Sequence, residues 1–240
     1  MPLPGAALGT STYALWLLGI AIASFLVSWF FTDVMHMRRT PYIGVLAVTT
    51  IALTVGYLSW SGTTGFVLTH WWLGLIGAAV SGAITILLAR RTPMWRARGT
   101  RFRLGQFLWE GLVYGTAEGV LLSVLPVLVT WQALDARGWT DTTGGTIGVG
   151  ALAVVASLAV IAIHHLGYRA FRGRQLVFAL LGCMWFSLAY LFTASPFGAV
   201  GGHIALHEAA DLHGFELPPH AAPARPEIVR TVEAERKAAA

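Results

Sequence analysis

The sequence predicts an all-α protein, a polytopic bundle of six transmembrane helices with a seventh, more polar helix that spans or re-enters the membrane. Hydrophobic residues make up 56% of the 240 positions and charged residues 11%, a composition typical of proteins that lie in lipid. The apolar residues come in long runs rather than at alternate positions, and most arginines lie between those runs. These observations predict one transmembrane helical domain over residues 1–217, followed by a flexible tail over residues 218–240.

Six runs are long enough to cross a hydrocarbon core of roughly 30 Å. They cover residues 13–31, 42–60, 66–89, 104–131, 146–166 and 176–194. No basic segment precedes the first run, which we therefore interpret as a span rather than a cleaved signal peptide. Small residues recur at helical spacing in the third and fourth spans, which predicts faces where helix backbones pack closely in lipid. These residues are Gly74, Ala78, Gly82, Gly111, Gly115 and Gly119.

The charged loops predict the orientation of the chain. Arginines follow the first, third and fifth spans, whereas the loop after the second span has no basic residue and the loop after the fourth has only Arg137. Because cytoplasmic loops are enriched in basic residues, the N-terminus is expected outside. The basic excess therefore reflects membrane orientation, and we expect no nucleic-acid partner. The expected partners are membrane lipids, a homo-oligomer is left open, and the single Cys183 excludes an internal disulfide.

The stretch from Gly201 to His220, GGHIALHEAADLHGFELPPH, concentrates ionisable residues in a chain that otherwise has few. A helix from about residue 202 to 213 would place His203, His207 and Asp211 on one face, at i, i+4 and i+8. A segment with this many ionisable groups cannot insert into lipid on its own. The other helices must therefore enclose it. It is expected either to cross as a seventh helix or to dip into the membrane from outside.

Ionisable residues also lie within the predicted spans, where each is by default a functional-site hypothesis. Glu110 and Glu118 share one face of the fourth span. At about 1.5 Å per residue, Glu118 lies in the outer half of the membrane, at the level expected for His203 and His207. His70, at the outer end of the third span, is expected to complete this outer layer.

A second, inner layer of ionisable groups is expected nearer the cytoplasm. Its members would be Glu110, His164 or His165, and Asp211 or His213 if the last helix crosses. His164 and His165 precede Arg169 by about one turn, which places them near the cytoplasmic end of the fifth span. A simple interfacial position for these two histidines is the competing interpretation.

The outer layer has the composition of a metal site. Two imidazoles one turn apart and a carboxylate from another helix give three ligands and an open position, the arrangement by which a divalent ion, most often zinc, activates water at neutral pH. The candidate ligands are His203, His207, Glu118 and His70. Glu118 is also a candidate catalytic residue. A second carboxylate, Glu208 or Asp211, could orient a ligating histidine or act as a general base.

The order of these residues resembles the CPBP family of intramembrane proteases, which includes the CAAX prenyl endopeptidases. The matching order is Glu118, then His164 or His165, then His203 with His207, within residues 104–214. The resemblance implies a multi-span helical protease whose active site combines a glutamate motif with histidines from later helices. Alanine and glycine flank the glutamate here, where the family has a doubled glutamate.

Three stretches, GLVYGTAEGVLLSVLPV, HHLGYRAFRG and ALHEAADLHGFELPPH, are also similar to uncharacterised bacterial polytopic membrane proteins. This similarity names no activity. It implies a multi-pass protein of the bacterial cytoplasmic membrane.

The sequence therefore leaves three functions open. The first is a membrane-embedded, metal-dependent hydrolase. The second is a proton-linked transporter or permease whose relay would comprise Glu110, Glu118, His164, His165 and Asp211. The third is b-type haem ligation by histidines that face each other from two spans, in an electron-transfer role. A retinal protein is excluded, because the only lysine, Lys237, lies in the tail.

Overall fold

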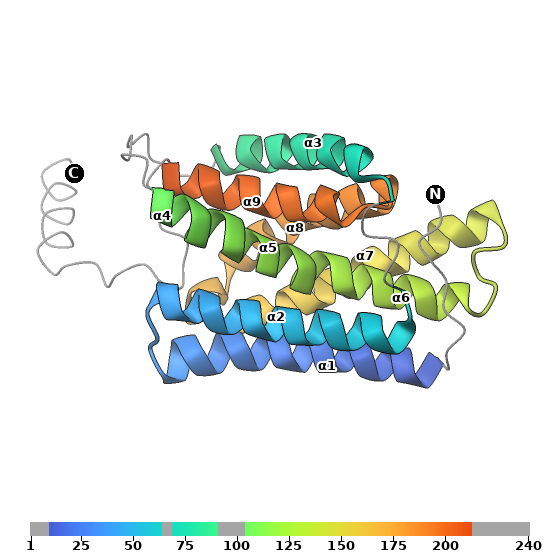
Figure 1. The fold of residues 1–240 in the computed structure, drawn as a ribbon, viewed down its shortest axis with the longest axis horizontal. Coiled ribbons are helices and arrows are strands. Elements are labelled where there is room, and N and C mark those ends of the chain that lie inside the picture. Colours follow the sequence, from blue (N-terminus) through green and yellow to red (C-terminus); the bar gives the residue numbers. More distant parts are fainter. Residues whose placement is uncertain (1–9, 64–68, 91–103, 213–240) are drawn as a thin grey trace, which may run out of the picture.

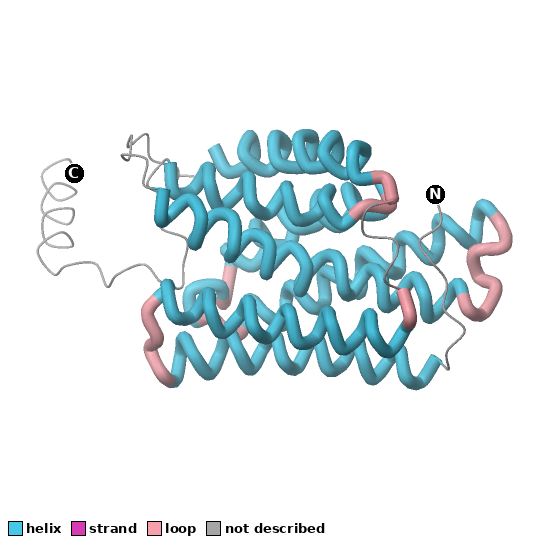
Figure 2. The backbone as a smooth tube through the Cα atoms, viewed as in Figure 1, coloured by secondary structure: helices cyan, strands magenta, loops and turns pink. Residues whose placement is uncertain are grey.

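The computed structural model describes residues 10–63, 69–90 and 104–212, and every regular element in these ranges is helical (Figures 1 and 2). The predicted tail, residues 218–240, lies outside these ranges. The elements are α1 (Thr10–Ser28), η1 (Trp29–Val34), α2 (Arg39–Ser61), α3 (Trp71–Arg90), α4 (Leu104–Gln106), η2 (Phe107–Val113), α5 (Tyr114–Glu118), η3 (Gly119–Val124), α6 (Leu125–Asp135), α7 (Thr143–Leu166), η4 (Arg169–Phe171), α8 (Arg174–Thr193) and α9 (Pro196–Leu212). The segments η1, η2 and η3 are π-helical, and η4 is a short 3₁₀ turn.

Six helical stretches are long and apolar enough to cross a membrane, which confirms the predicted all-α class with six spans. They are Ser11–Val34, Arg39–Ser61, Trp71–Leu88, Leu104–Asp135, Thr143–Leu166 and Arg174–Thr193. The fourth runs without a break through α4, η2, α5, η3 and α6. An N-terminus on the outer side stays a prediction from the arginine-bearing loops.

The fourth span is the central helix of the bundle. The most apolar window of this span is 78% buried, whereas the corresponding windows of the other five spans are 22–39% buried. Figure 1 shows it between the pair α1 and α2 on one side and α9 with α3 on the other. Glu118, Ser123 and Gln132 on this helix are therefore shielded from lipid by protein, the position in which ionisable residues are tolerated within a membrane.

Helix α9 begins at Pro196, about six residues before the start that the sequence predicted, and it packs along α3. A Cβ atom added to Gly82 would lie 2.9 Å from the Cβ of Ala205, and one added to Gly74 would lie 2.8 Å from the Cβ of Phe197. The two helices therefore run in the same direction, in contact through the small-residue stripe of α3. This course favours the crossing alternative for α9, and the crossing itself stays a prediction.

The glycine stripe of the fourth span packs against the opposite side of α9. A Cβ atom added to Gly115 would lie 2.7 Å from the Cα of Ile204, and one added to Gly119 would lie 2.8 Å from the Cα of Val200. Such distances leave no room for any side chain on these glycines. The stripes are therefore close packing faces, as their spacing predicted, and the helix that they pack against is α9.

The ends of α1, α7 and the fourth span that are predicted to face the cytoplasm lie on one side of the bundle. Asp33 accepts a hydrogen bond from Arg169 Nε at 3.2 Å, and Arg172 Nη2 lies 3.4 Å from the same carboxylate. Arg39, at the start of α2, pairs with Glu110 at 2.7 Å. These pairs join the first connection to the fourth span and the end of the first span to the fifth connection.

Candidate metal site

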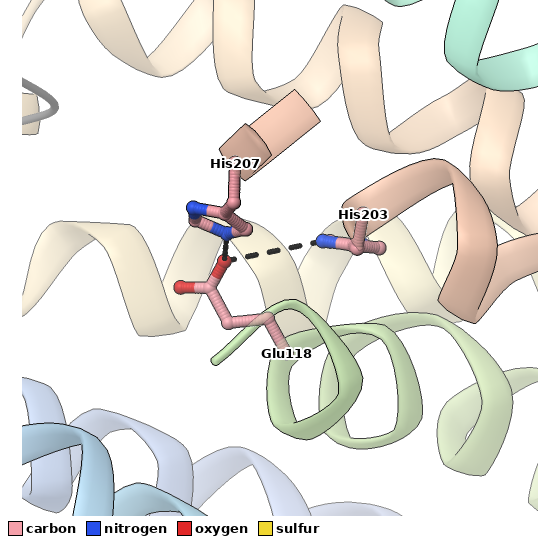
Figure 3. Close-up of side chains that lie close together, drawn as sticks. All are labelled: Glu118, His203 and His207. Carbon is pink, nitrogen blue, oxygen red and sulfur yellow. Dashed lines mark hydrogen bonds and ion pairs between the residues drawn. The ribbon is translucent and has the colours of Figure 1, made fainter. Parts of the chain in front are cut away.

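Glu118, His203 and His207 form a buried cluster between α5 and α9 (Figure 3). Each residue offers one possible ligand atom, and the three atoms lie within 4.8 Å of one another. The exposed fractions are 7% for Glu118, 1% for His203 and 3% for His207. The structure therefore brings together three of the four ligands that the sequence predicted.

Local helix geometry places these side chains. His203 and His207 are one turn apart, so both imidazoles leave α9 on the same face. Gly115 and Gly119 allow the backbone of α9 to approach the fourth span closely enough for both rings to reach Glu118. Glu118 itself ends the short segment α5 between the π-helical segments η2 and η3. Insertions of π-helix occur frequently at functional sites.

The two imidazoles differ in how they meet the carboxylate. His207 Nε2 is 2.8 Å from Glu118 Oε2 and donates to it, because a carboxylate oxygen accepts. His203 Nδ1 is 3.9 Å from the same oxygen and has no hydrogen-bond partner among the described residues. A buried nitrogen without a partner is costly unless something else satisfies it. A cation bound by this nitrogen and by Glu118 would satisfy it, so the cluster fits a divalent metal.

Neighbouring side chains fix both rings. His203 Nε2 lies 3.3 Å from the hydroxyl of Ser123, and its ring packs on Phe186 at a centroid distance of 4.3 Å. The ring of His207 packs on Tyr114 at 4.5 Å. Groups that orient the ligands in this way are a regular part of protein metal sites.

His164, on α7, also reaches the cluster. Its Nε2 lies 3.8 Å from Glu118 Oε1, the carboxylate oxygen that faces away from His207. Its Nδ1 donates to the backbone carbonyl of Ser24 at 3.1 Å, so in the neutral ring Nε2 accepts a hydrogen bond from the Tyr168 hydroxyl at 2.9 Å. The Tyr168 oxygen is in turn hydrogen-bonded to the Tyr42 hydroxyl. Burial raises the pKa of Tyr168 well above its ordinary value, which keeps this donor protonated.

The expectation that His164 belongs to a separate inner layer is wrong. A count of depth treats the end of α7 as lying at the membrane surface, but other helices cover the face of α7 that carries His164. His164 is 0% exposed and Tyr168, just beyond the helix, is 1% exposed. Ser28 donates to the His164 carbonyl at 2.7 Å, which ties the end of α7 to α1.

Of the other predicted members of the inner layer, the two whose side chains the structure describes, Glu110 and His165, make separate contacts. Glu110 pairs with Arg39 at 2.7 Å rather than with a histidine. His165 is buried, donates from Nδ1 to the Ile161 carbonyl at 2.8 Å and packs on Phe171. These contacts give His165 a structural role within α7 and the loop that follows.

Glu208 and Asp211, the candidates for a second carboxylate, both lie on α9. Glu208 directly follows His207, but its carboxylate lies against Gly111 and is not part of the three-residue cluster. Asp211 lies in the last turn of α9, where the structure describes the backbone only. His213 lies outside the described residues.

His70 is not part of the cluster, so the prediction of a fourth ligand from the third span is wrong. Helices α3 and α9 run in parallel, and Gly74 lies against Ser195 at the start of α9. Gly74 is therefore level with the beginning of α9, and His70 lies one turn before that level. His203 lies about twelve residues further along than His70, or roughly 18 Å at 1.5 Å per residue.

The prediction from sequence did not include Ser123, Tyr168 or Tyr42. Tyr168 stands four residues after His164, a spacing that could have suggested a contact. Ser123 and Tyr42 carry no comparable signal, because serine and tyrosine are common in membrane helices. Comparison with known proteins adds no family to this picture: no protein-family model, no curated protein and no solved structure matches the chain.

Proposed function

We propose that the protein is a metal-dependent hydrolase that acts within the membrane, with Glu118, His203 and His207 as the ligands of one divalent ion. The observation that carries the proposal is that one ligand atom from each residue converges within 4.8 Å, inside a bundle of apolar helices. Two imidazoles and one carboxylate form a ligand set of catalytic zinc sites, so zinc is the expected ion. Such an ion would supply Lewis acidity for hydrolysis.

His164 is the proposed general base of this reaction, in place of Glu208 or Asp211. A general base must lie near the reacting centre and must not itself bind the metal ion. His164 meets this requirement, because its Nε2 is 3.8 Å from the ligand Glu118. The Ser24 carbonyl keeps the proton of the neutral ring on Nδ1, so Nε2 carries the lone pair. The Tyr168 hydroxyl, which donates to this lone pair at 2.9 Å, would have to turn away when Nε2 takes a proton.

We also propose a distant relation to the CPBP proteases and a location in the bacterial cytoplasmic membrane. The support is that Glu118, His164, His203 and His207, which carry the resemblance, lie in one contiguous cluster in the order that the family pattern requires. On this relation the bond hydrolysed would be a peptide bond.

Metal content tests the proposal directly. Protein purified in detergent, reconstituted with zinc and freed of excess ion should retain about one zinc per chain by elemental analysis. His203→Ala and His207→Ala should each lose most of this zinc, because each removes one of three ligands. His70→Ala is the matched control and should retain it, since His70 is outside the cluster. Wild-type protein without zinc, or equal loss in the His70 variant, would contradict the proposal.

A proton-linked transporter is the second candidate, and one observation favours it. Glu118, His164, Tyr168 and Tyr42 form a chain of buried, neighbouring proton-bearing groups. A transporter should show a proton flux in liposomes that Glu118→Gln abolishes and that needs no metal. A hydrolase should show no such flux. The absorption spectrum of the same sample tests the haem alternative, because a haem protein would be visibly coloured.

A further inference from the structure

Ser123 has a buried hydroxyl that the proposed reaction does not use. It is 0% exposed, lies in η3 five residues after Glu118, and its Oγ is 3.3 Å from His203 Nε2. The other ring nitrogen of His203 is directed to Glu118 Oε2 at 3.9 Å and has no hydrogen-bond partner among the described residues. The two nitrogens of this ring therefore face two different groups, the hydroxyl and the candidate metal site.

The hydroxyl determines which form of His203 can bind a metal. A neutral imidazole carries one proton, and the nitrogen that binds a cation must be the one without it. If Nδ1 is the ligand atom, Nε2 carries the proton and needs an acceptor in a buried place. Within the described structure, the only hydrogen-bond partner of Nε2 is the Ser123 hydroxyl oxygen.

Contacts of the fourth span with α7 and α8 fix the position of Ser123. The carbonyl of the preceding residue, Leu122, accepts a hydrogen bond from Ser157 on α7 at 2.7 Å. Ser157 is hydrogen-bonded to Ser187 on α8 at 2.8 Å. The His203 ring, whose Nε2 lies near the Ser123 hydroxyl, also packs on Phe186 of α8. The ring is therefore held between the fourth span and α8. This arrangement orients the ring before any ion binds.

We propose that Ser123 is a positioning residue of the metal site, which holds the His203 ring with its proton on Nε2 and presents Nδ1 to the ion. The inference rests on the proposed metal site. Partners that orient ligating histidines typically contribute 10- to 100-fold to metal affinity. Ser123→Ala should therefore weaken zinc binding by about 10- to 100-fold. Ser123→Thr, which restores the hydroxyl, should recover most of that affinity.

The experiment measures zinc affinity of the full-length protein by competition with a chromogenic chelator. Thr85→Val is the control: Thr85 is also buried, at 4% exposed, but its hydroxyl bonds only within α3, to the Ser81 carbonyl at 2.9 Å. This control should bind zinc like the wild type. Cobalt(II) replaces zinc in a parallel titration, because its visible absorption reports ligand geometry. A positioning role predicts an altered cobalt spectrum in Ser123→Ala, whereas general loss of stability would lower the bound fraction without changing the spectrum.

The outcomes separate this inference from the proposed function. No zinc binding by the wild type would refute the metal site itself. A wild type that binds zinc, with Ser123→Ala equal in affinity and in cobalt spectrum, would overturn the role of Ser123 alone. If Ser123→Ala does not fold, nitrogen-15 NMR of the zinc-loaded wild type decides. A proton on Nε2 of His203 supports the proposal, and a proton on Nδ1 rejects it.

Discussion

Replacement of Gly115 by valine is expected to separate α9 from the fourth span and to abolish metal binding. A Cβ atom at this position would lie 2.7 Å from Ile204 Cα and 3.1 Å from the His203 carbonyl carbon, which are backbone atoms that cannot rotate away. Overpacking of this kind costs about 1–3 kcal/mol, and displacement of α9 removes His203 and His207 from Glu118. Thermal unfolding in detergent and zinc affinity should therefore both fall.

The control for this variant is Gly148→Val, in the second turn of α7. A Cβ atom at Gly148 meets nothing within 4 Å, so the same substitution should leave the unfolding temperature and zinc affinity close to wild type. Wild-type zinc affinity in Gly115→Val would show that the contact between the glycine stripe and α9 is not required for the site.

The sequence was sufficient to predict the spans and the central polar cluster because both depend on one-dimensional spacing. Apolar runs define the spans by length alone. The i, i+4 spacing of His203 and His207 places them on one face, and the depth count put Glu118 at their level. The glycine stripes on the third and fourth spans then indicated which faces pack closely, and the structure shows α9 between them.

Residue spacing and depth do not predict contacts that depend on where a helix ends and how it is rotated about its axis. Depth within the membrane places His70 near His203, but depth alone does not say how far along α9 a residue of α3 packs. Depth also places His164 on the inner side, because it does not account for the protein packed against the end of α7. Ser28 and Tyr168 instead enclose that end, and no spacing rule predicts such a contact between distant segments. The π-helical segments on both sides of Glu118 also have no clear sequence signal.

Removal of the bound metal is expected to lower the stability of the whole protein, because the site joins two helices that are far apart in the sequence. Glu118 lies on the central span and His203 and His207 lie on α9, so an ion bound by all three stabilises their contact. A ligand that binds only the folded state stabilises it by about 2.7 kcal/mol when its free concentration is 100-fold above the Kd. Addition of a strong chelator should therefore lower the thermal unfolding temperature of the zinc-loaded wild type.

Glu118→Gln should lose this response to the chelator, since an amide oxygen is a much weaker zinc ligand than a carboxylate. The matched control is Glu110→Gln, which makes the same change on the same span at a residue that pairs with Arg39 and not with the histidines. This control changes the ion pair, so its unfolding temperature without metal can differ from that of the wild type. The shift caused by the chelator should nevertheless be as large as in the wild type, because all three ligands remain. An equal chelator shift in Glu118→Gln would mean that the stabilising ion is bound elsewhere, and Glu118 would then act on the histidines only as a hydrogen-bond acceptor.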